Sequence, residues 1–325
     1  MTHSQTSVRC HPATGPLFTV AMPCFRARDT IATAVVSVLA QTERDFELIV
    51  IDDGGSDGSA AAAMAAAGTD RRVSLIRQDN AGPAAARNRG IAAGSGRLIA
   101  FLDSDDRWAP TCLARHRDHF ARQPGLGVSF ARVRFFDAAM ARPGRVSANA
   151  GRLTLAHALG ENPLCTTSNL VARRAVFDAA GGFDVAMTHA EDQEWVARVL
   201  AATDWRVDGL DDVLVDYRTS HSGLSADLDR MRAGWRAMVE RLRALAPGRV
   251  SAAESQAAAL FERYLCRRAL RTGQPATRAA RHLAAAFRHD PLALFAGGPR
   301  RTLLTSAGVL AAALLPRGWA NTLVA

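Results

Sequence analysis

Four short apolar runs in the first third of the chain constrain its fold more than any other feature. The runs span 17–23, 46–54, 73–78 and 97–102, and segments with helical spacing of apolar residues lie between them at 29–42, 59–67 and 82–94. Strands that alternate with helices pair in parallel, because a crossover helix returns the chain to the same end of the sheet. We therefore predict an α/β fold with a Rossmann-like, mainly parallel sheet flanked by helices.

Acidic residues follow two of these runs directly. The last run leads into Asp103, Asp105 and Asp106, and the second ends in Asp52 and Asp53. Ligands of such sheets bind beyond the carboxyl ends of the strands, so both acidic groups should lie on the ligand side. Clustered carboxylates repel one another unless a cation or hydrogen-bond donors intervene, and a hard divalent cation would remove that conflict. For a D-x-D pattern alone, however, we favour a plain turn with helix capping at Asp106.

Six stretches together resemble one enzyme family in their order and spacing. They are TVAMPCF, SVLAQT…FELIVIDDGGSDGS, NAGPAAARNRGIAAGSGRLIAFLDSDDRW, GGFD, AEDQEW and YRTSHSGLS. The chain resembles family-2 inverting glycosyltransferases of the glycosyltransferase-A (GT-A) fold over residues 17–224. The resemblance implies a nucleotide-binding half at 17–108 and an acceptor half at 109–224. Gly55 departs from the family, which usually has Ser there, and we expect it to loosen that turn.

The resemblance also implies roles for matching residues. Pro23 and Phe25 would line the nucleotide pocket, either Asp52 or Asp53 would meet the base together with Arg87, and Asp103 would meet the ribose. The implied metal site for Mg²⁺ or Mn²⁺ contains Asp105, which would bridge the donor phosphates through the metal, with Asp106 adjacent and His221 nearby. For His221, a solvated loop histidine explains the sequence equally well.

The general base is expected in the ED pair. An inverting transfer needs one carboxylate to deprotonate the acceptor hydroxyl in line with the leaving diphosphate. The family motif places the base on Asp192, with Glu191 as a supporting neighbour or alternative. Without the resemblance we would assign both residues to favourable interaction with a helix N-terminus.

The last third of the chain carries the whole basic excess. All 40 basic residues are arginine; residues 1–220 hold 24 of them against 25 acidic residues, and residues 221–325 hold 16 against 6. We expect residues 225–325 to form an Ala/Arg-rich helical region. It is either a solvated face packed on the catalytic domain, which we favour, or an attachment to an anionic membrane leaflet, where a lipid-linked acceptor would reside. The absence of a nucleic-acid motif argues against nucleic acid as a partner.

Residues 1–16 are expected to be disordered and lack the apolar core of a signal peptide. The five cysteines form no CxxC pair, which favours a reducing compartment. The apolar stretch 303–315 is shorter than the roughly 20 residues that a spanning helix needs, so it should be a core helix or lie on a surface. We therefore expect a cytoplasmic protein, with the inner face of the membrane as the alternative place.

The expected activity is transfer of a sugar from a nucleotide-sugar donor, most often UDP-linked in this family, to a hydroxyl of a glycan such as a cell-envelope polysaccharide or of a lipid-linked acceptor. One alternative is a non-catalytic nucleotide-sugar-binding scaffold, which loss of the D-x-D or ED carboxylates would signal. The other is a nucleotidyltransferase, which should carry a Gly/Arg/Lys-rich phosphate loop after the first strand, whereas AMPCFRARDT contains no glycine.

Overall fold

The computed structural model describes residues 15–148, 151–161, 164–187, 190–219, 228–295 and 299–314. The chain forms two compact units. The first comprises the residues up to 152 together with 164–195 and 205–219, and the second comprises 153–163, 196–204 and the residues from 220 onward. The second unit therefore includes two pieces that lie within the predicted GT-A range 17–224.

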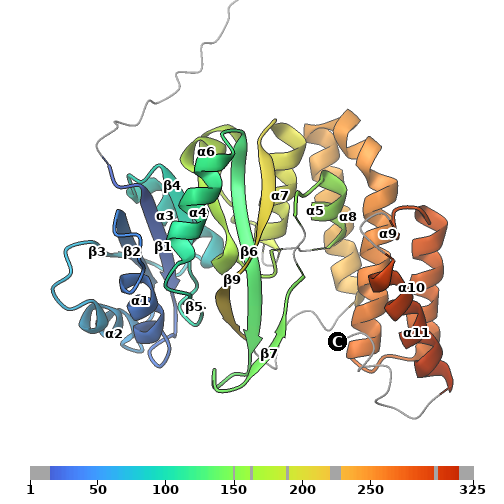
Figure 1. The fold of residues 1–325 in the computed structure, drawn as a ribbon, viewed down its shortest axis with the longest axis horizontal. Helices are drawn as coiled ribbons and strands as arrows, with labels where there is room; N and C mark the ends of the chain where they lie inside the picture. The colour runs from blue at the N-terminus through green and yellow to red at the C-terminus, as the bar shows by residue number, and fades with distance from the viewer. Residues whose placement is uncertain are drawn as a thin grey trace, which may run out of the picture. The chain divides into compact units, whose positions relative to one another are not determined.

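The first unit is built on one nine-stranded sheet (Figure 1). Its strands are β1 (Phe18–Cys24), β2 (Phe46–Asp53), β3 (Val73–Gln78), β4 (Leu98–Phe101), β5 (Arg107–Trp108), β6 (Leu126–Phe136), β7 (Pro143–Val146), β8 (Val171–Arg173) and β9 (Arg206–Arg218). The order is β3-β2-β1-β4-β8-β6-β9-β5, with β7 paired to β6. Strands β1 to β4 pair in parallel as predicted, as do β6 and β9, whereas β8, β5 and β7 add antiparallel pairs. The predicted α/β sheet is confirmed, and it is mixed beyond β4.

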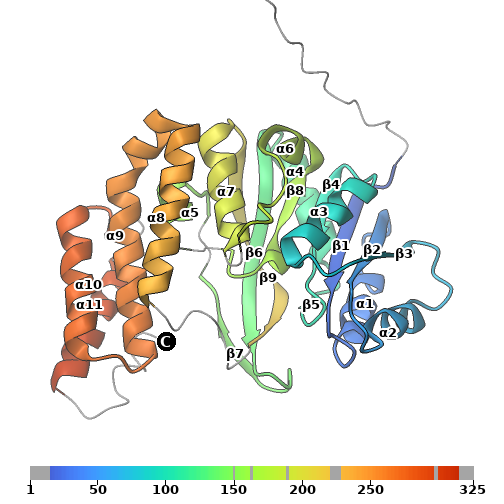
Figure 2. The ribbon, with the colours of Figure 1, turned by 180° about the vertical axis from the view of Figure 1, so that it is seen from behind.

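The helices of the first unit cover both faces of the parallel strands. They are α1 (Ile31–Leu39), α2 (Ser59–Ala67), α3 (Pro83–Ala93), α4 (Cys112–Arg122), α6 (Arg174–Ala180) and the start of α7 (Glu191–Ala202), with a 3₁₀ turn η1 (Thr167–Asn169). Phe18, Val20 and Met22 of β1 share one core cluster with Val35 of α1 and Ala63 of α2. Side chains alternate along a strand, so the β1 residues between Phe18, Val20 and Met22 point to the opposite face of the sheet. Helix α3 covers that face, and Figure 2 shows α3 in front.

Glycines allow α3 and the loop after it to approach β1 closely. A Cβ on Gly90 would lie 2.6 Å from the Cβ of Ala21 and 3.0 Å from Ile51. A Cβ on Gly96 would lie 2.3 Å from the backbone nitrogen of Thr19, and the Gly96 N–H donates to the Thr19 hydroxyl at 2.8 Å. The glycines of the stretch NRGIAAGSG are therefore required by packing on the central strand.

The second unit is helical, and it contains the predicted C-terminal helices. Its helices are α5 (Leu155–Gly160), the end of α7, α8 (Leu228–Leu245), α9 (Pro247–Arg271), α10 (Ala276–His289) and α11 (Arg300–Leu314). Helix α9 is its central member and contacts α5, α8, α10 and α11. Trp235 of α8 stacks on Phe261 of α9 with ring centroids 4.9 Å apart. Across the described part of the chain, no helix is both long and apolar enough to span a bilayer.

We expect Gly96→Ala to destabilise the first unit by about 3 kcal/mol, because its added methyl group would meet backbone rather than a flexible side chain. The matched control is Gly125→Ala, where the nearest atoms belong to the movable guanidinium of Arg206 at 3.3 Å, so the change should stay under about 0.5 kcal/mol. Chemical denaturation measures both. Equal midpoints for the two variants would contradict the proposed close packing on β1.

Candidate functional site

The chain turns sharply at the carboxyl end of β4, and the turn gathers three carboxylates. The Asp106 N–H donates to the carbonyl of Asp103 at 3.1 Å and closes the turn. Asp106 is buried, and both of its carboxylate oxygens accept hydrogen bonds: one from the Ser168 hydroxyl at 2.5 Å and the other from the Arg218 N–H at 2.9 Å. Asp106 thus ties the turn to η1 and to the end of β9.

Asp105 has a different environment within the same turn. Burial and the neighbouring charge of Asp103 raise its pKa. Arg218 donates to the Asp105 carbonyl at 3.1 Å, but no side chain of the described residues forms an ion pair with the Asp105 carboxylate. A partly buried carboxylate beside a like charge fits a divalent cation, which would relieve the repulsion.

The described residues contain no group of three or more His, Cys, Asp or Glu side chains that already converges on a metal position. The predicted metal residue His221 lies outside the described residues.

Arg87 of α3 joins the end of β4 to the start of α7. Its side chain is buried, with only 4% of the residue exposed. Its guanidinium donates to Asp103 Oδ1 at 2.7 Å and to Glu191 Oε1 at 2.6 Å. Burial opposes the positive charge, but the two carboxylates outweigh it and raise the pKa of Arg87 above its usual value. Arg87, which we predicted to contact the nucleotide base, is thus bound here by two of the predicted site carboxylates. One of them, Glu191, is 104 residues away in the sequence.

Asp192 shares an electrostatic environment with the D-x-D turn. It is buried at the start of α7 and accepts a hydrogen bond from the Gln193 N–H at 2.7 Å. The pKa of Tyr217, near the end of β9, is raised to about 12. Burial is the largest cause, followed by the charges of Asp106, Asp103, Asp105 and Asp192. The four carboxylates therefore lie close enough to Tyr217 for their charges to act on it.

Sequence reasoning did not assign Tyr217 or Arg218 to the site. Both belong to the stretch YRTSHSGLS that contributed to the resemblance, and the strand DVLVDYR ends in them. A strand that ends in a tyrosine and an arginine is a weak signal by itself. It becomes informative only when β9 is known to end beside the D-x-D turn.

The GGFD stretch docks on α3 and supports the start of α7. The Asn88 amide donates to the Phe183 carbonyl and accepts from the Phe183 N–H, both at 2.8 Å. A Cβ on Gly182 would lie 2.4 Å from the Asn88 side chain. Trp195 donates to the Gly181 carbonyl at 2.8 Å, and its ring stacks on Phe177 at 4.4 Å. Trp195 is thus a core residue whose contacts fix the ED pair.

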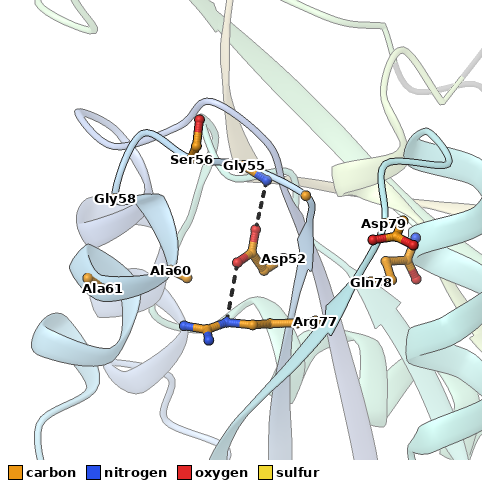
Figure 3. Close-up of a pocket in the computed structure, with 10 residues that line it drawn as sticks. Asp52, Gly55, Ser56, Gly58, Ala60, Ala61, Arg77, Gln78 and Asp79 are labelled. Atoms are coloured by element: carbon orange, nitrogen blue, oxygen red, sulfur yellow. Dashed lines mark hydrogen bonds and ion pairs between the residues drawn. The ribbon is translucent and has the colours of Figure 1, made fainter.

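A cavity of about 730 Å³ opens at the carboxyl ends of β2 and β3 (Figure 3). Residues of β2, the 54–58 loop, α2 and β3 line it. Asp52 points into the cavity, accepts a hydrogen bond from the Gly55 N–H at 3.1 Å and pairs with Arg77 at 3.6 Å. The volume of this cavity falls in the range of small-ligand sites.

Asp53 faces a different environment from Asp52. Its carboxylate accepts from the Gln78 side chain at 2.7 Å and from the N–H groups of Ala81 and Gly82, both at 2.9 Å. Asp53 therefore holds the turn that leads into α3, while Asp52 is the carboxylate that lines the cavity. Gly55, which we expect to loosen this turn, donates its N–H to Asp52 Oδ1 at 3.1 Å.

The two predicted residues at the end of β1 are also placed. Pro23 is partly buried and lies opposite Ile51 of β2 in the parallel register. Phe25 follows the strand and is exposed, with the Arg26 guanidinium 5.1 Å from the centre of its ring. An exposed aromatic ring beyond a strand end is available to stack on a planar ligand.

Comparison with known proteins identifies one family. The family described as Glycosyl transferase family 2 matches residues 19–181. The succinoglycan biosynthesis protein ExoU of Rhizobium meliloti is 43% identical over 116 residues, 35% of this chain and 32% of the relative. The UDP-Glc:alpha-D-GlcNAc-diphosphoundecaprenol beta-1,3-glucosyltransferase WfgD of Escherichia coli is 42% identical over 93 residues, 28% of this chain and 36% of the relative. The match thus spans less than half the length of these curated relatives.

Solved structures show the same fold. A crystal structure of Staphylococcus aureus TarS residues 1–349 aligns with a TM-score of 0.55 at 16% identity, over 85% of this chain and 89% of that one. The mannosyltransferase PcManGT of Pyrobaculum calidifontis, in complex with GDP-Man and Mn²⁺, aligns with a TM-score of 0.58 at 18% identity, over 93% and 87%. At these identities the likeness establishes the fold alone.

We expect Arg87→Gln to lower the free energy of unfolding by about 3 kcal/mol, because it leaves Asp103 and Glu191 without their shared partner. Arg77→Gln is the matched control; the Arg77 side chain is 75% exposed and lies 3.6 Å from Asp52, so the effect should stay under about 1 kcal/mol. Adding Glu191→Gln to the Arg87 variant should restore part of the loss. An Arg87→Gln protein as stable as the wild type in chemical denaturation would contradict the bridging role.

Proposed function

The chain belongs to glycosyltransferase family 2 and is a glycosyltransferase; on that premise we propose that it moves a sugar from a nucleotide-sugar donor to a hydroxyl acceptor with inversion at the anomeric carbon. The observation that carries the proposal is the Arg87 bridge between Asp103 and Glu191. It brings the D-x-D turn and the ED pair, far apart in sequence, to one site. The acceptor is a glycan or a lipid-linked saccharide.

Asp192 is the proposed general base. Its carboxylate takes the proton of the acceptor hydroxyl, the acceptor oxygen bonds to the anomeric carbon, and the bond from that carbon to the nucleoside diphosphate breaks. Inversion follows when the attacking and leaving oxygens lie on opposite sides of the carbon. Glu191 is held by Arg87, so we assign it to positioning of the adjacent base. A single carboxylate suffices, in contrast to the paired acids of glycoside hydrolases.

Asp105 is the residue proposed to hold Mg²⁺ or Mn²⁺. A bound cation offsets the charge that develops on the departing diphosphate. Both oxygens of Asp106 are engaged by Ser168 and Arg218, so we propose that Asp106 supports the metal-binding turn from behind. His221 remains the proposed additional ligand from 220–227.

The donor is proposed to bind along the carboxyl ends of β1, β2 and β4. Asp52 is the proposed carboxylate for the base, because it lines the cavity and its second partner is the exposed side chain of Arg77. Asp53 is held instead by Gln78 and two backbone N–H groups. Phe25 and Pro23 would contribute the apolar wall, and Asp103 the ribose contact. A uridine nucleotide is favoured by WfgD, whose name specifies UDP-Glc.

Calorimetric titration with UDP, GDP and dTDP, each with and without Mn²⁺, tests the donor site. We expect UDP to bind in a metal-dependent way. Asp105→Asn should weaken the metal-dependent part at least about tenfold, because it removes the carboxylate charge that attracts the cation. The matched control is Asp211→Asn, an exposed aspartate of β9 that should leave binding unchanged. Absence of nucleotide binding, or binding indifferent to metal, would count against the proposal.

Asp192→Asn should lower kcat by about 10²–10⁴-fold and leave donor binding close to that of the wild type, because the amide cannot accept the proton. Glu191→Gln provides the comparison and should have the smaller effect on kcat. A larger loss in the Glu191 variant would transfer the role of base to Glu191. The anomeric configuration of the product, determined by NMR, checks inversion independently; a retained configuration would refute the inverting mechanism.

A further inference from the structure

Helix α11 of the second unit turns a small, partly polar face inward. Its buried residues are Thr302, Thr305, Gly308 and Ala311. Two buried arginines of α9 meet this face: Arg263 lies 3.1 Å from the Thr302 hydroxyl, and Arg267 lies 3.3 Å from the Thr305 hydroxyl. The polar partners on α9 therefore select the threonine face of α11 for burial.

The large apolar residues of α11 consequently face outward. Leu303, Leu310 and Leu314 are 57%, 62% and 79% exposed. They are seven and four positions apart, so at about 100° per residue they lie within about 40° of one another around the helix. Burial of one leucine is worth about 1.5–3 kcal/mol, and a single exposed leucine is ordinary. Three in one row, about 16 Å long, indicate a surface that is covered by something apolar.

The segment that carries this leucine row is strongly basic. Residues 276–314 hold five arginines and one aspartate. Arg281, Arg288 and Arg300 are exposed and form no ion pair with any of the described residues. A second copy of this segment would add charge of the same sign, whereas anionic lipid head groups would complement the positive charge.

We propose that α11 docks on the surface of an anionic phospholipid bilayer, with Leu303, Leu310 and Leu314 in the acyl boundary and exposed arginines of α10 and α11 available to the lipid phosphates. A 15-residue helix is about 22 Å long, too short for a hydrocarbon core of about 30 Å, so it lies on the membrane without crossing it. The sequence allowed either a core helix or a surface segment at 303–315; the outward leucines favour the second. This inference does not depend on the proposed reaction.

Vesicle co-sedimentation of the full chain tests the docking surface. Vesicles of phosphatidylglycerol and phosphatidylethanolamine should retain the protein, vesicles of phosphatidylcholine alone should retain much less, and added salt should weaken the binding. The triple variant Leu303→Gln, Leu310→Gln, Leu314→Gln should bind anionic vesicles at least about tenfold more weakly. The matched control is Leu245→Gln, an exposed leucine at the end of α8, which should bind like the wild type.

Because the three leucines are exposed, the triple variant should keep the thermal unfolding midpoint of the wild type, and circular dichroism verifies this. Three results would overturn the proposal: no binding of the wild type to anionic vesicles, equal binding to phosphatidylcholine vesicles, or unchanged binding of the triple variant. A dimer that the triple variant abolishes would instead assign the leucine row to a second copy of the chain. Nucleotide binding by calorimetry is independent of all these outcomes.

Discussion

The geometry of the candidate site depends on one buried arginine between two carboxylates. Arg87 has four-percent exposure and two short charge-assisted hydrogen bonds, to Asp103 and Glu191. A guanidinium in such a position remains charged because both of its neighbours are acidic, and its planar fork fixes their separation. The same charge lowers the cost of bringing the D-x-D turn next to the ED pair, where unbalanced carboxylates would repel one another.

The elements around this bridge are held by packing that leaves little freedom. Glycines 90 and 96 allow α3 to approach β1, which sets the position of Arg87 relative to β4. The neighbouring Asn88 forms two hydrogen bonds with the backbone of Phe183. Trp195 of α7 stacks on Phe177 of α6. Positioning of charged groups by a rigid apolar layer is a general requirement for a site that must act on developing charge.

The helical unit follows a different logic, in which buried polar groups decide the packing. Arg263 and Arg267 of α9 bond to the threonines of α11, and Arg232 of α8 pairs with Glu262 of α9 at 2.6 Å, beside His282 of α10. Buried charges that lack partners are costly, so these pairs restrict which face each helix can turn inward. The outward leucines of α11 are the consequence.

Much of the fold and several candidate site residues could be predicted from the sequence alone. Alternation of apolar runs with helical segments predicted the parallel strands β1 to β4 and their flanking helices, since periodicity and crossover geometry are local properties. The acidic strand ends and the ED pair were recognisable because they belong to contiguous motifs. Only the tertiary structure separated the roles of adjacent residues. Asp52 lines the cavity while Asp53 holds a turn. Asp106 accepts from Ser168 and Arg218, while Asp105 forms no ion pair with any of the described residues. The ion pair of Arg87 with Glu191 and the exposure of the leucines of α11 are likewise seen only in the tertiary structure. The spacing of residues shows which of them share a helix face or a strand end. Which face is buried depends on contacts with residues from distant parts of the chain.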